Sequence, residues 1–101
     1  MAYGRVVIYR FKPETIEEII QKATEGVIPL YQAQPGFLAY DLIQTSAEEA
    51  ISVSTWASAA QAEQADGAVA GWLRAHLGHA IVAADRRMGD VIAATATGAR
   101  P

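Results

Sequence analysis

At 101 residues, 51% of them hydrophobic, the chain is long enough for a single domain with one core. Its formal net charge of −3 argues against a nucleic-acid partner, because affinity for a phosphate backbone comes mostly from clustered Lys and Arg. The absence of cysteine excludes disulfides, thiolate nucleophiles, Cys-based zinc sites and iron–sulfur clusters.

The N-terminal segment does not have the pattern of a leader peptide. Residues 1–10 lack an uninterrupted apolar core, and no run in the chain approaches the roughly 18 apolar residues that cross a bilayer. We therefore expect a cytoplasmic protein without membrane contact. A single domain is expected over residues 1–97, with a tail over residues 98–101.

The first two elements are expected to be a strand and a helix. Residues 3–11 mix β-branched and aromatic side chains, which predicts a strand. One face of this strand carries Val6 and Ile8, and the other carries Val7, Tyr9 and Phe11. Pro13 and a capping-box pattern at Thr15-Ile16-Glu17-Glu18 predict a helix, and Gly26 with Pro29 predicts a kink or break near its end. The apolar stripe of this helix is made by Ile16, Ile19, Ile20, Ala23 and Val27.

A turn and two further strands are expected next. Gln34-Pro35-Gly36 predicts the turn, residues 37–45 the second strand and residues 50–56 the third, so the two strands should form an antiparallel hairpin. Alternation in the second strand places Phe37, Ala39 and Ile43 opposite Leu38, Tyr40 and Leu42. Alternation in the third places Ile51, Val53 and Thr55 opposite Ser52, Ser54 and Trp56.

The third strand is expected to lead into the second helix with almost no loop. Ser58-Ala59-Ala60-Gln61 has the form of a capping box, so we predict a helix over residues 59–77, ended by Gly78 as a left-handed C-cap. Its apolar side is made by Ala62, Ala65, Val69, Trp72, Leu73 and Leu77. Residues 80–84 fit either a helical continuation or the approach to a strand, and residues 88–97 predict the last strand.

The order of these elements predicts an α+β fold of the ferredoxin-like βαββαβ type. In this arrangement a four-stranded antiparallel sheet carries both helices on one face. The strands have large apolar residues on both faces, whereas two helices cover only one. We therefore expect a homodimer in which two sheets pack through their helix-free faces.

Four short stretches carry a family resemblance. They are Pro35-Gly36-Phe37-Leu38, Ser52-Val53-Ser54-Thr55-Trp56 followed by Ser58, Trp72-Leu73 at the end of an alanine-rich helix, and Gly89-Asp90-Val91. With these motifs, and over most of residues 3–95, the chain resembles the antibiotic biosynthesis monooxygenase family of dimeric α+β barrels. The resemblance implies a pocket between sheet and helices and oxygenation of a small aromatic phenol or quinol without any cofactor.

Trp56 matches a position that recurs near the pocket in this family, so the resemblance implies a substrate-binding role. Ser52 and Ser54 lie on the same strand face and, being small and polar, would leave room for a ligand beside the ring. The alternative interpretation is that Trp56 is a large core aromatic at the end of a strand.

His76 is the candidate catalytic base, because a histidine side chain ordinarily titrates near neutral pH. The alternative is a solvated group near the end of a helix. His76 and His79 have i, i+3 spacing, but two histidines without a placed carboxylate do not predict a metal site.

Tyr9 and Tyr40 are expected to line the cavity, Tyr9 binding the substrate and Tyr40 assisting its deprotonation. Each could instead be a core or dimer-interface residue whose hydroxyl reaches water. Asp41 is a conspicuous carboxylate in an apolar strand and is either a base or a solvent-facing residue of an edge strand.

The sequence departs from the family's pattern at two points, and these narrow the activities that the resemblance implies. The chain contains no asparagine, which the quinone-forming and haem-degrading relatives are expected to use, and residues 67–70 contain no histidine that could bind haem. Haem degradation is therefore not expected. The alternatives to oxygenation are a non-catalytic ligand-binding or stress-associated dimer, and an RNA-binding sheet, which the acidic net charge argues against.

Overall fold

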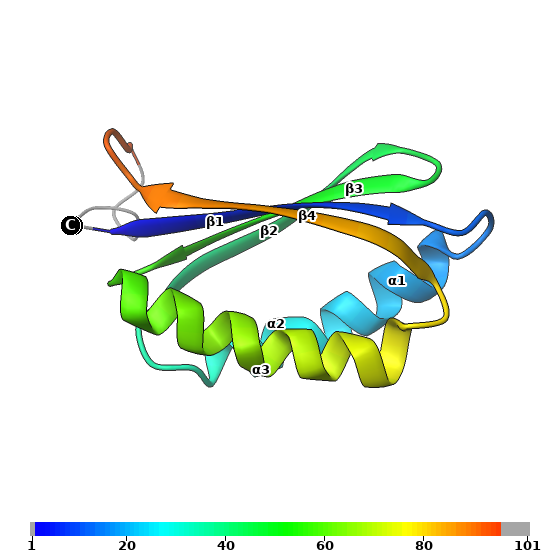
Figure 1. Cartoon of the computed structure of the whole chain (residues 1–101), viewed down its shortest axis with the longest axis horizontal. Helices are drawn as coiled ribbons and strands as arrows, with labels where there is room; N and C mark the ends of the chain where they lie inside the picture. Colours follow the sequence, from blue (N-terminus) through cyan, green and yellow to red (C-terminus); the bar gives the residue numbers. More distant parts are fainter. Residues whose placement is uncertain (1, 96–101) are drawn as a thin grey trace.

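The computed structural model describes residues 2–95, which form one antiparallel sheet with all helical segments on one face (Figure 1). The strand order is β2-β3-β1-β4. The elements are β1 (Tyr3–Phe11), α1 (Ile16–Lys22), η1 (Ala23–Val27), α2 (Ile28–Gln32), β2 (Phe37–Ser46), β3 (Glu49–Trp56), α3 (Ala59–Leu77) and β4 (Ile81–Asp90). This is the ferredoxin-like α+β arrangement that the order of elements predicts. No helix in this part of the chain is long and apolar enough to span a membrane.

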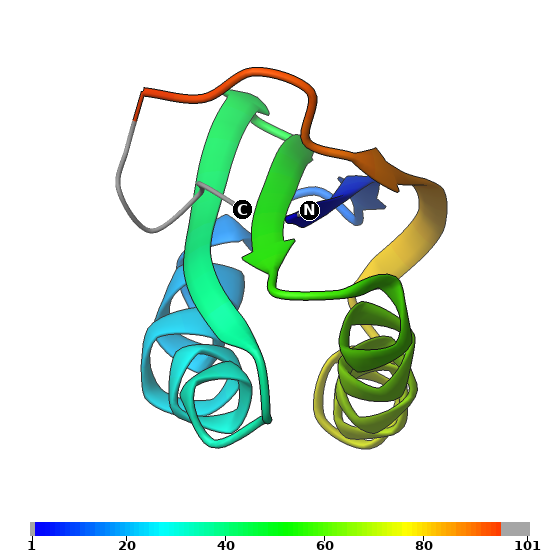
Figure 2. The same ribbon diagram turned by 90° about the vertical axis from the view of Figure 1, so that its left-hand side faces the viewer.

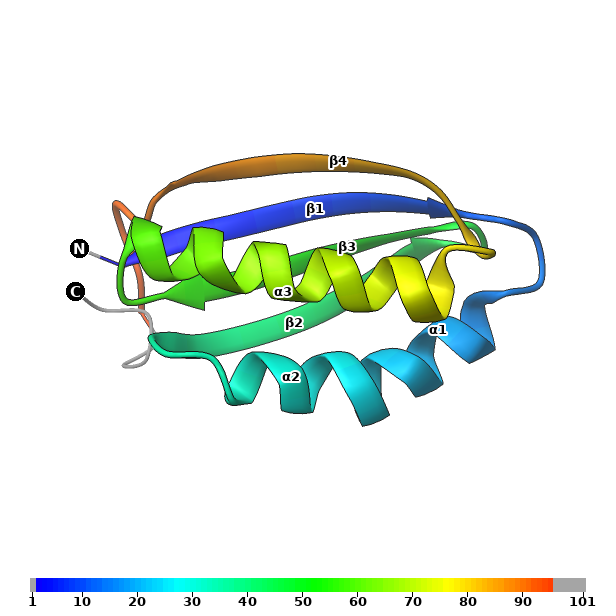
Figure 3. The same cartoon turned by 60° about the horizontal axis from the view of Figure 1, so that its bottom comes forward.

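The helical layer has two rows that run side by side beneath the sheet (Figures 2 and 3). One row is α3, and the other is α1 and α2 joined by η1, a π-helical segment. The expected interruption near Gly26 and Pro29 is therefore present as a π-helix rather than as a break. A Cβ added to Gly26 would lie 2.1 Å from a ring carbon of Trp72, so the absence of a side chain at this position lets α3 pack closely against η1.

The two predicted helix caps have different outcomes. Ser58 has an extended backbone, and its hydroxyl accepts a hydrogen bond from the Gln61 amide at 3.2 Å, so this cap is confirmed. The cap at Thr15 is wrong, because its backbone is already near-helical and its hydroxyl turns back to donate to the Lys12 carbonyl at 2.7 Å. The left-handed C-cap is also wrong, since Gly78 has a φ of −57°.

The last strand lies earlier in the chain than expected. Residues 81–90 form β4, whereas the prediction was residues 88–97, of which 96 and 97 lie outside the described residues. β4 pairs with β1 along its whole length, from Phe11↔Ile81 to Tyr3↔Asp90. This long-range pairing outweighs the low strand propensity of the charged stretch within β4.

A β-bulge also changes the predicted faces of β2. The register shifts between Phe37 and Ala39, so Phe37 lies on the same side as Tyr40 and Leu42 rather than opposite them. All three pack against the core beneath the sheet. The expected alternation holds in β1 and β3, whose buried side chains face the helices.

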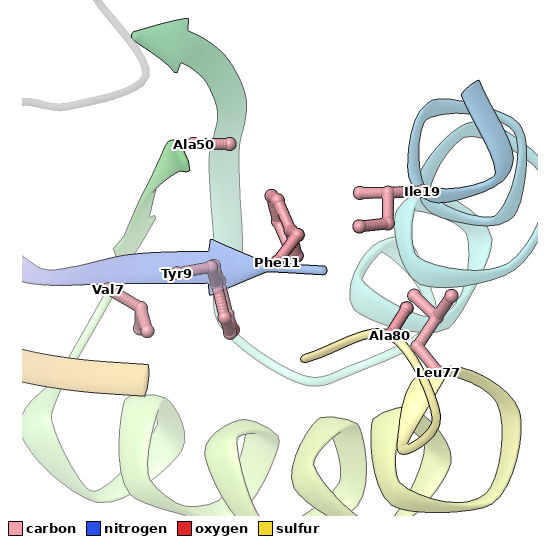
Figure 4. Packing of buried hydrophobic residues seen from close by; sticks show 7 residues of the cluster. All are labelled: Val7, Tyr9, Phe11, Ile19, Ala50, Leu77 and Ala80. Carbon is pink, nitrogen blue, oxygen red and sulfur yellow. The ribbon is translucent and has the colours of Figure 1, made fainter. Parts of the chain in front are cut away.

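The core between sheet and helices has two adjoining clusters. At one end, side chains of β1 meet α1 and the end of α3; the cluster comprises Val7, Tyr9, Phe11, Ile19, Ala50, Leu77 and Ala80 (Figure 4). The other is built around two aromatic side chains and comprises Ala23, Val27, Tyr31, Trp56, Ala62, Ala65 and Val69. The candidate site lies where these clusters meet.

Candidate functional site

A small cavity, called here the inner cavity, lies between the sheet and the two helical rows. Its volume is about 20 Å³, which is room for about one water molecule. The lining is mostly aliphatic, with the phenol rings of Tyr9, Tyr31 and Tyr40 as its polar members. Two of these three were predicted to line a cavity, and Tyr31 was not.

A larger cleft, called here the α3–β4 cleft, adjoins the inner cavity. Its volume is about 230 Å³, and it shares Tyr9, Leu73 and Ile81 with the inner cavity. The lining of the cleft also includes Arg5, Arg74 and Arg86. This cleft therefore leads from the protein surface to the tyrosines, past three arginines.

A second cleft adjoins the inner cavity on the opposite side, between α1, η1 and β2. Its volume is about 350 Å³, and it shares Ala23, Tyr40 and Leu42 with the inner cavity. Asp41 lies at this cleft, on the exposed edge strand β2. Its position agrees with the interpretation of a solvent-facing edge residue.

Arg5 places a positive charge inside the core. It is only 1% exposed, and its guanidinium pairs with Asp66 of α3 through Nε at 2.5 Å. Nη1 of Arg5 donates to the hydroxyl of Tyr31 at 2.6 Å. Burial alone would lower the pKa of Arg5, because it disfavours the charged form. The interactions with Tyr31, Tyr9 and Asp66 outweigh this effect, so the pKa of Arg5 is raised.

Arg5 was not predicted to be a core residue, although the sequence contains a signal for it. Arg5 has the same strand parity as Val7, Tyr9 and Phe11, which marks it as facing the helices. A charged residue is rarely expected in a core, because burial is unfavourable unless a partner is present. That partner, Asp66, is far away in sequence and could not be identified from spacing.

Tyr31 connects this charge to a cluster of aromatic rings. Its ring centroid lies 5.0 Å from that of Tyr40, 5.4 Å from that of Trp56 and 6.3 Å from that of Phe37. Burial raises the pKa of Tyr31 to about 12. Its phenol is therefore neutral at ordinary pH and links the Arg5 guanidinium to the wall of the inner cavity.

Burial also raises the pKa of Tyr40 well above its usual range, with Tyr31 as the next contributor. A phenol with this property is protonated at neutral pH, so Tyr40 can donate a hydrogen bond but does not serve as a ready base. The raised pKa therefore does not favour the expected role of Tyr40 in deprotonating the substrate.

Trp56 lies behind the cavity wall rather than on it. Its side chain is fully buried, and its indole Nε1 donates to the Ser54 hydroxyl at 3.0 Å. Ser54 therefore bonds the indole ring, and neither residue lines the inner cavity or the two clefts. The hydroxyl of Ser52 is buried without a partner among the described residues. These three side chains support the tyrosines and do not line the inner cavity.

His76 is not brought to the cavity. It is exposed on α3, where its ring stacks on Trp72 at 4.4 Å between centroids, and it lines neither the inner cavity nor the two clefts. His79 pairs with Glu18 of α1 at 2.8 Å. Among residues 2–95, no group of three metal-ligating side chains gathers around these histidines or elsewhere.

The chain is similar to known proteins both in sequence and in fold. A family model described as antibiotic biosynthesis monooxygenase matches residues 2–78, which include β1 through α3. No match was found among the curated proteins.

Several solved structures have a similar fold. A protein of unknown function from Nitrosomonas europaea, NE2512, has 18% identity over 94% of this chain and 93% of its own, with a TM-score of 0.78. A monooxygenase from the gene ActVA-Orf6 of Streptomyces coelicolor, solved with the ligand nanaomycin D, has 20% identity over 94% and 91%, with a TM-score of 0.75. SnoaB, a cofactor-independent oxygenase from Streptomyces nogalater, has 13% identity over 92% and 95%, with a TM-score of 0.70. At these identities the structural likeness shows the fold alone.

Proposed function

Because this chain belongs to the antibiotic biosynthesis monooxygenase family, we propose that it is a cofactor-independent monooxygenase that oxidises a small aromatic phenol or quinol. The observation that supports this proposal is the inner cavity, where three tyrosines meet between sheet and helices next to a buried arginine.

The proposed reaction needs no external reductant. A phenol gives up its hydroxyl proton, and the resulting anion transfers an electron to O₂. The radical pair then combines to form a carbon–oxygen bond, and loss of water from this peroxide gives a quinone. One atom of O₂ ends in the quinone and the other in water, so the substrate supplies all the electrons.

The protein's contribution is to stabilise the phenolate and to exclude water. Tyr40 would donate a hydrogen bond to the substrate oxygen, since its raised pKa keeps its own proton in place. The Arg5 charge acts through Tyr31, whose hydroxyl is polarised by the guanidinium at 2.6 Å. His76 does not line the cavity, so the substrate would release its proton to solvent as its ring enters the α3–β4 cleft, and the filled cleft would then exclude water from the inner cavity.

The volumes favour a substrate of one or two rings. The inner cavity of about 20 Å³ is far smaller than the roughly 300 to 1,000 Å³ of ordinary ligand pockets. The ring would therefore occupy an adjoining cleft. We assign it to the α3–β4 cleft because the arginines and Tyr9 line that cleft, and its reactive oxygen would reach Tyr40 across the inner cavity. Tyr9, Leu73 and Ile81 form the shared wall, and Leu73 and Tyr9 would shift to admit the ring.

We also propose that the working unit is a homodimer formed through the helix-free face of the sheet. Two rows of aliphatic side chains cross this face, one made by Ile43, Ile51 and Ile8 and the other by Val53 and Val6. Ile43 remains 51% exposed. A second copy would remove this apolar surface from water.

The alternative function is a non-catalytic ligand-binding module of the same fold. The observation that favours it is the position of His76 outside the cavity, which leaves no evident base beside the tyrosines. Oxygen uptake by the purified, metal-free protein with a panel of quinols and anthrones distinguishes the two. The oxygenase proposal requires uptake with matching formation of quinone, and the binding module requires ligand affinity without either.

A further inference from the structure

The α3–β4 cleft has a composition that differs from the rest of this acidic protein. Three of its lining residues are arginines, Arg5, Arg74 and Arg86, and none of its lining residues is acidic. The whole chain carries a formal net charge of −3. Positive charge is therefore concentrated at one concave site.

The nearest carboxylate does not neutralise this charge. Asp66 accepts hydrogen bonds from Arg5 through Oδ1 and from Arg86 through Oδ2, the latter at 3.1 Å. One carboxylate shared by two guanidinium groups leaves one positive charge, and Arg74 adds a second. The two aspartates of β4 do not change this balance, because Asp85 pairs with Arg87 on the opposite face of the strand and Asp90, at its end, does not line the cleft.

The three arginines have different roles in the cleft. Arg5 is fixed in the core by Asp66 and Tyr31. Arg86 is 51% exposed and uses one Nη1 for Asp66, so most of its five N–H donors remain for a ligand. Arg74 is exposed on α3, one helical turn from Ala70 of the same cleft.

The arginines adjoin an apolar wall rather than open solvent. Ala70, Leu73, Ile81 and Ala84 line the same cleft, and Tyr9 lies where the cleft meets the inner cavity. A ligand that fills about 230 Å³ here would have an anionic end against the arginines and a flat apolar body along this wall.

We infer that the α3–β4 cleft binds the carboxylate of an aromatic acid, held by Arg86 and Arg74 while its ring lies toward Tyr9 and the inner cavity. A guanidinium binds a carboxylate in a planar, charge-assisted pair, which suits a ring with a coplanar substituent. This inference rests on the proposed function and assigns its substrate to a class, the carboxylated phenols and quinols.

The inference is tested with naphthoate and its neutral isostere naphthamide, neither of which is a quinol. Isothermal titration calorimetry on the full chain gives the ratio of their dissociation constants. Naphthoate is expected to bind about tenfold or more tightly than naphthamide at low salt, because only the carboxylate can form charge-assisted hydrogen bonds with the arginines. This ratio should fall as ionic strength rises.

The variants Arg74→Gln and Arg86→Gln, combined, should bring the two dissociation constants to within about twofold, with naphthamide affinity unchanged. The matched control is the combination of Lys12→Gln and Lys22→Gln, because neither lysine lines the α3–β4 cleft and Lys22 also pairs with a carboxylate, that of Glu18. This combination also removes two positive charges and should retain the wild-type ratio.

Equal affinities in the wild type, no naphthoate binding at millimolar concentration, or a preference that survives the double variant would each overturn the inference. If one of these results is obtained but the protein takes up oxygen with neutral quinols, the carboxylate site is excluded and the proposed oxygenase activity stands. Binding of naphthoate with the expected ratio but no oxygen uptake with carboxylated or neutral quinols would overturn the oxygenase and retain the anion site.

Discussion

The guanidinium of Arg5 and the hydroxyl of Tyr31 lie 2.6 Å apart inside the core, on opposite layers of the fold. Arg5 belongs to the central strand β1 and Tyr31 to α2, so this hydrogen bond joins the sheet to the helical row that carries the π-helix. It also brings a positive charge within one hydrogen bond of the inner cavity. Its loss should therefore affect both stability and chemistry.

Replacing Tyr31 with Phe is expected to lower the free energy of unfolding by about 2 kcal/mol, because a donor of a buried charged group loses its acceptor. Urea denaturation measures the change. Tyr40→Phe is the matched control, since Tyr40 is a neighbouring buried tyrosine with its ring centroid 5.0 Å away, but Arg5 does not donate to it. Similar losses in both variants would contradict a special role for the Arg5–Tyr31 bond.

Asp66→Asn is expected to destabilise the protein by about 3 kcal/mol, because it leaves the buried guanidinium of Arg5 without a countercharge. Glu18→Gln removes a carboxylate from a surface ion pair with Lys22 on α1 and should change stability far less. Thermal and urea denaturation of both variants provide the comparison. A small effect of Asp66→Asn would indicate that water solvates Arg5.

Glycine-to-alanine substitutions should change stability in opposite directions in the two helical rows. Gly26→Ala places a Cβ 2.1 Å from the Trp72 ring and should destabilise the fold by about 1 to 3 kcal/mol through overpacking. Gly67→Ala, on α3 with open space around its added Cβ, should stabilise it by up to about 1 kcal/mol. Denaturation midpoints check both signs, and a neutral Gly26→Ala would mean that Trp72 can move away at little cost.

Stability should fall at alkaline pH because of the buried tyrosines. The pKa of Tyr31 is raised from an ordinary value of 10.0 to about 12 in the folded protein. Below pH 10 both states hold the proton and the full stability is present; between pH 10 and about 12 the unfolded state ionises first, so stability declines. Phenolate absorbance followed against pH, together with circular dichroism, should show that these tyrosines ionise as the protein unfolds. In Tyr31→Phe the stability should decline less steeply over the same range, and an identical decline would count against this assignment.

The proposed dimer is tested by a charge on the helix-free face. Ile51→Glu, in the middle of the aliphatic row, should produce a monomer in sedimentation velocity at micromolar concentration. Ile20→Glu is the control, because Ile20 is also largely exposed but lies on α1 in the helical layer. A wild-type monomer, or a dimer unaffected by Ile51→Glu, would exclude this interface.

Much of the fold could be predicted from local patterns. Alternation in β3 correctly placed Ser52, Ser54 and Trp56 on one face, and the cap at Ser58 marked the start of α3 correctly. The boundaries of β4 depend on pairing with β1 far away in the sequence, so no local pattern indicated them. The bulge at Phe37 likewise depends on register with β3.

The candidate site was predictable only in part. Tyr9 and Tyr40 were identified because aromatic residues on strands often line a core, and both line the inner cavity. Arg5, Asp66 and Tyr31 were missed, since their meeting requires three elements to pack together. His76 was chosen for its chemistry, and helical spacing alone could not show that its ring stacks on Trp72 at the surface.

The central proposal is oxygenation at the tyrosine-lined cavity, and Tyr40→Phe tests it most directly. The measurement is the initial rate of oxygen uptake and of quinone formation by metal-free protein with its best quinol substrate. We expect one quinone per O₂ in the wild type and a rate lower by about a hundredfold in Tyr40→Phe, because a hydrogen-bond donor to the developing oxyanion is removed. Tyr3→Phe, which alters a tyrosine that lines neither the cavity nor the α3–β4 cleft, should keep the wild-type rate. Absence of oxygen uptake with the whole panel of quinols and anthrones, or an unchanged rate in Tyr40→Phe, would contradict the proposed oxygenation at this cavity.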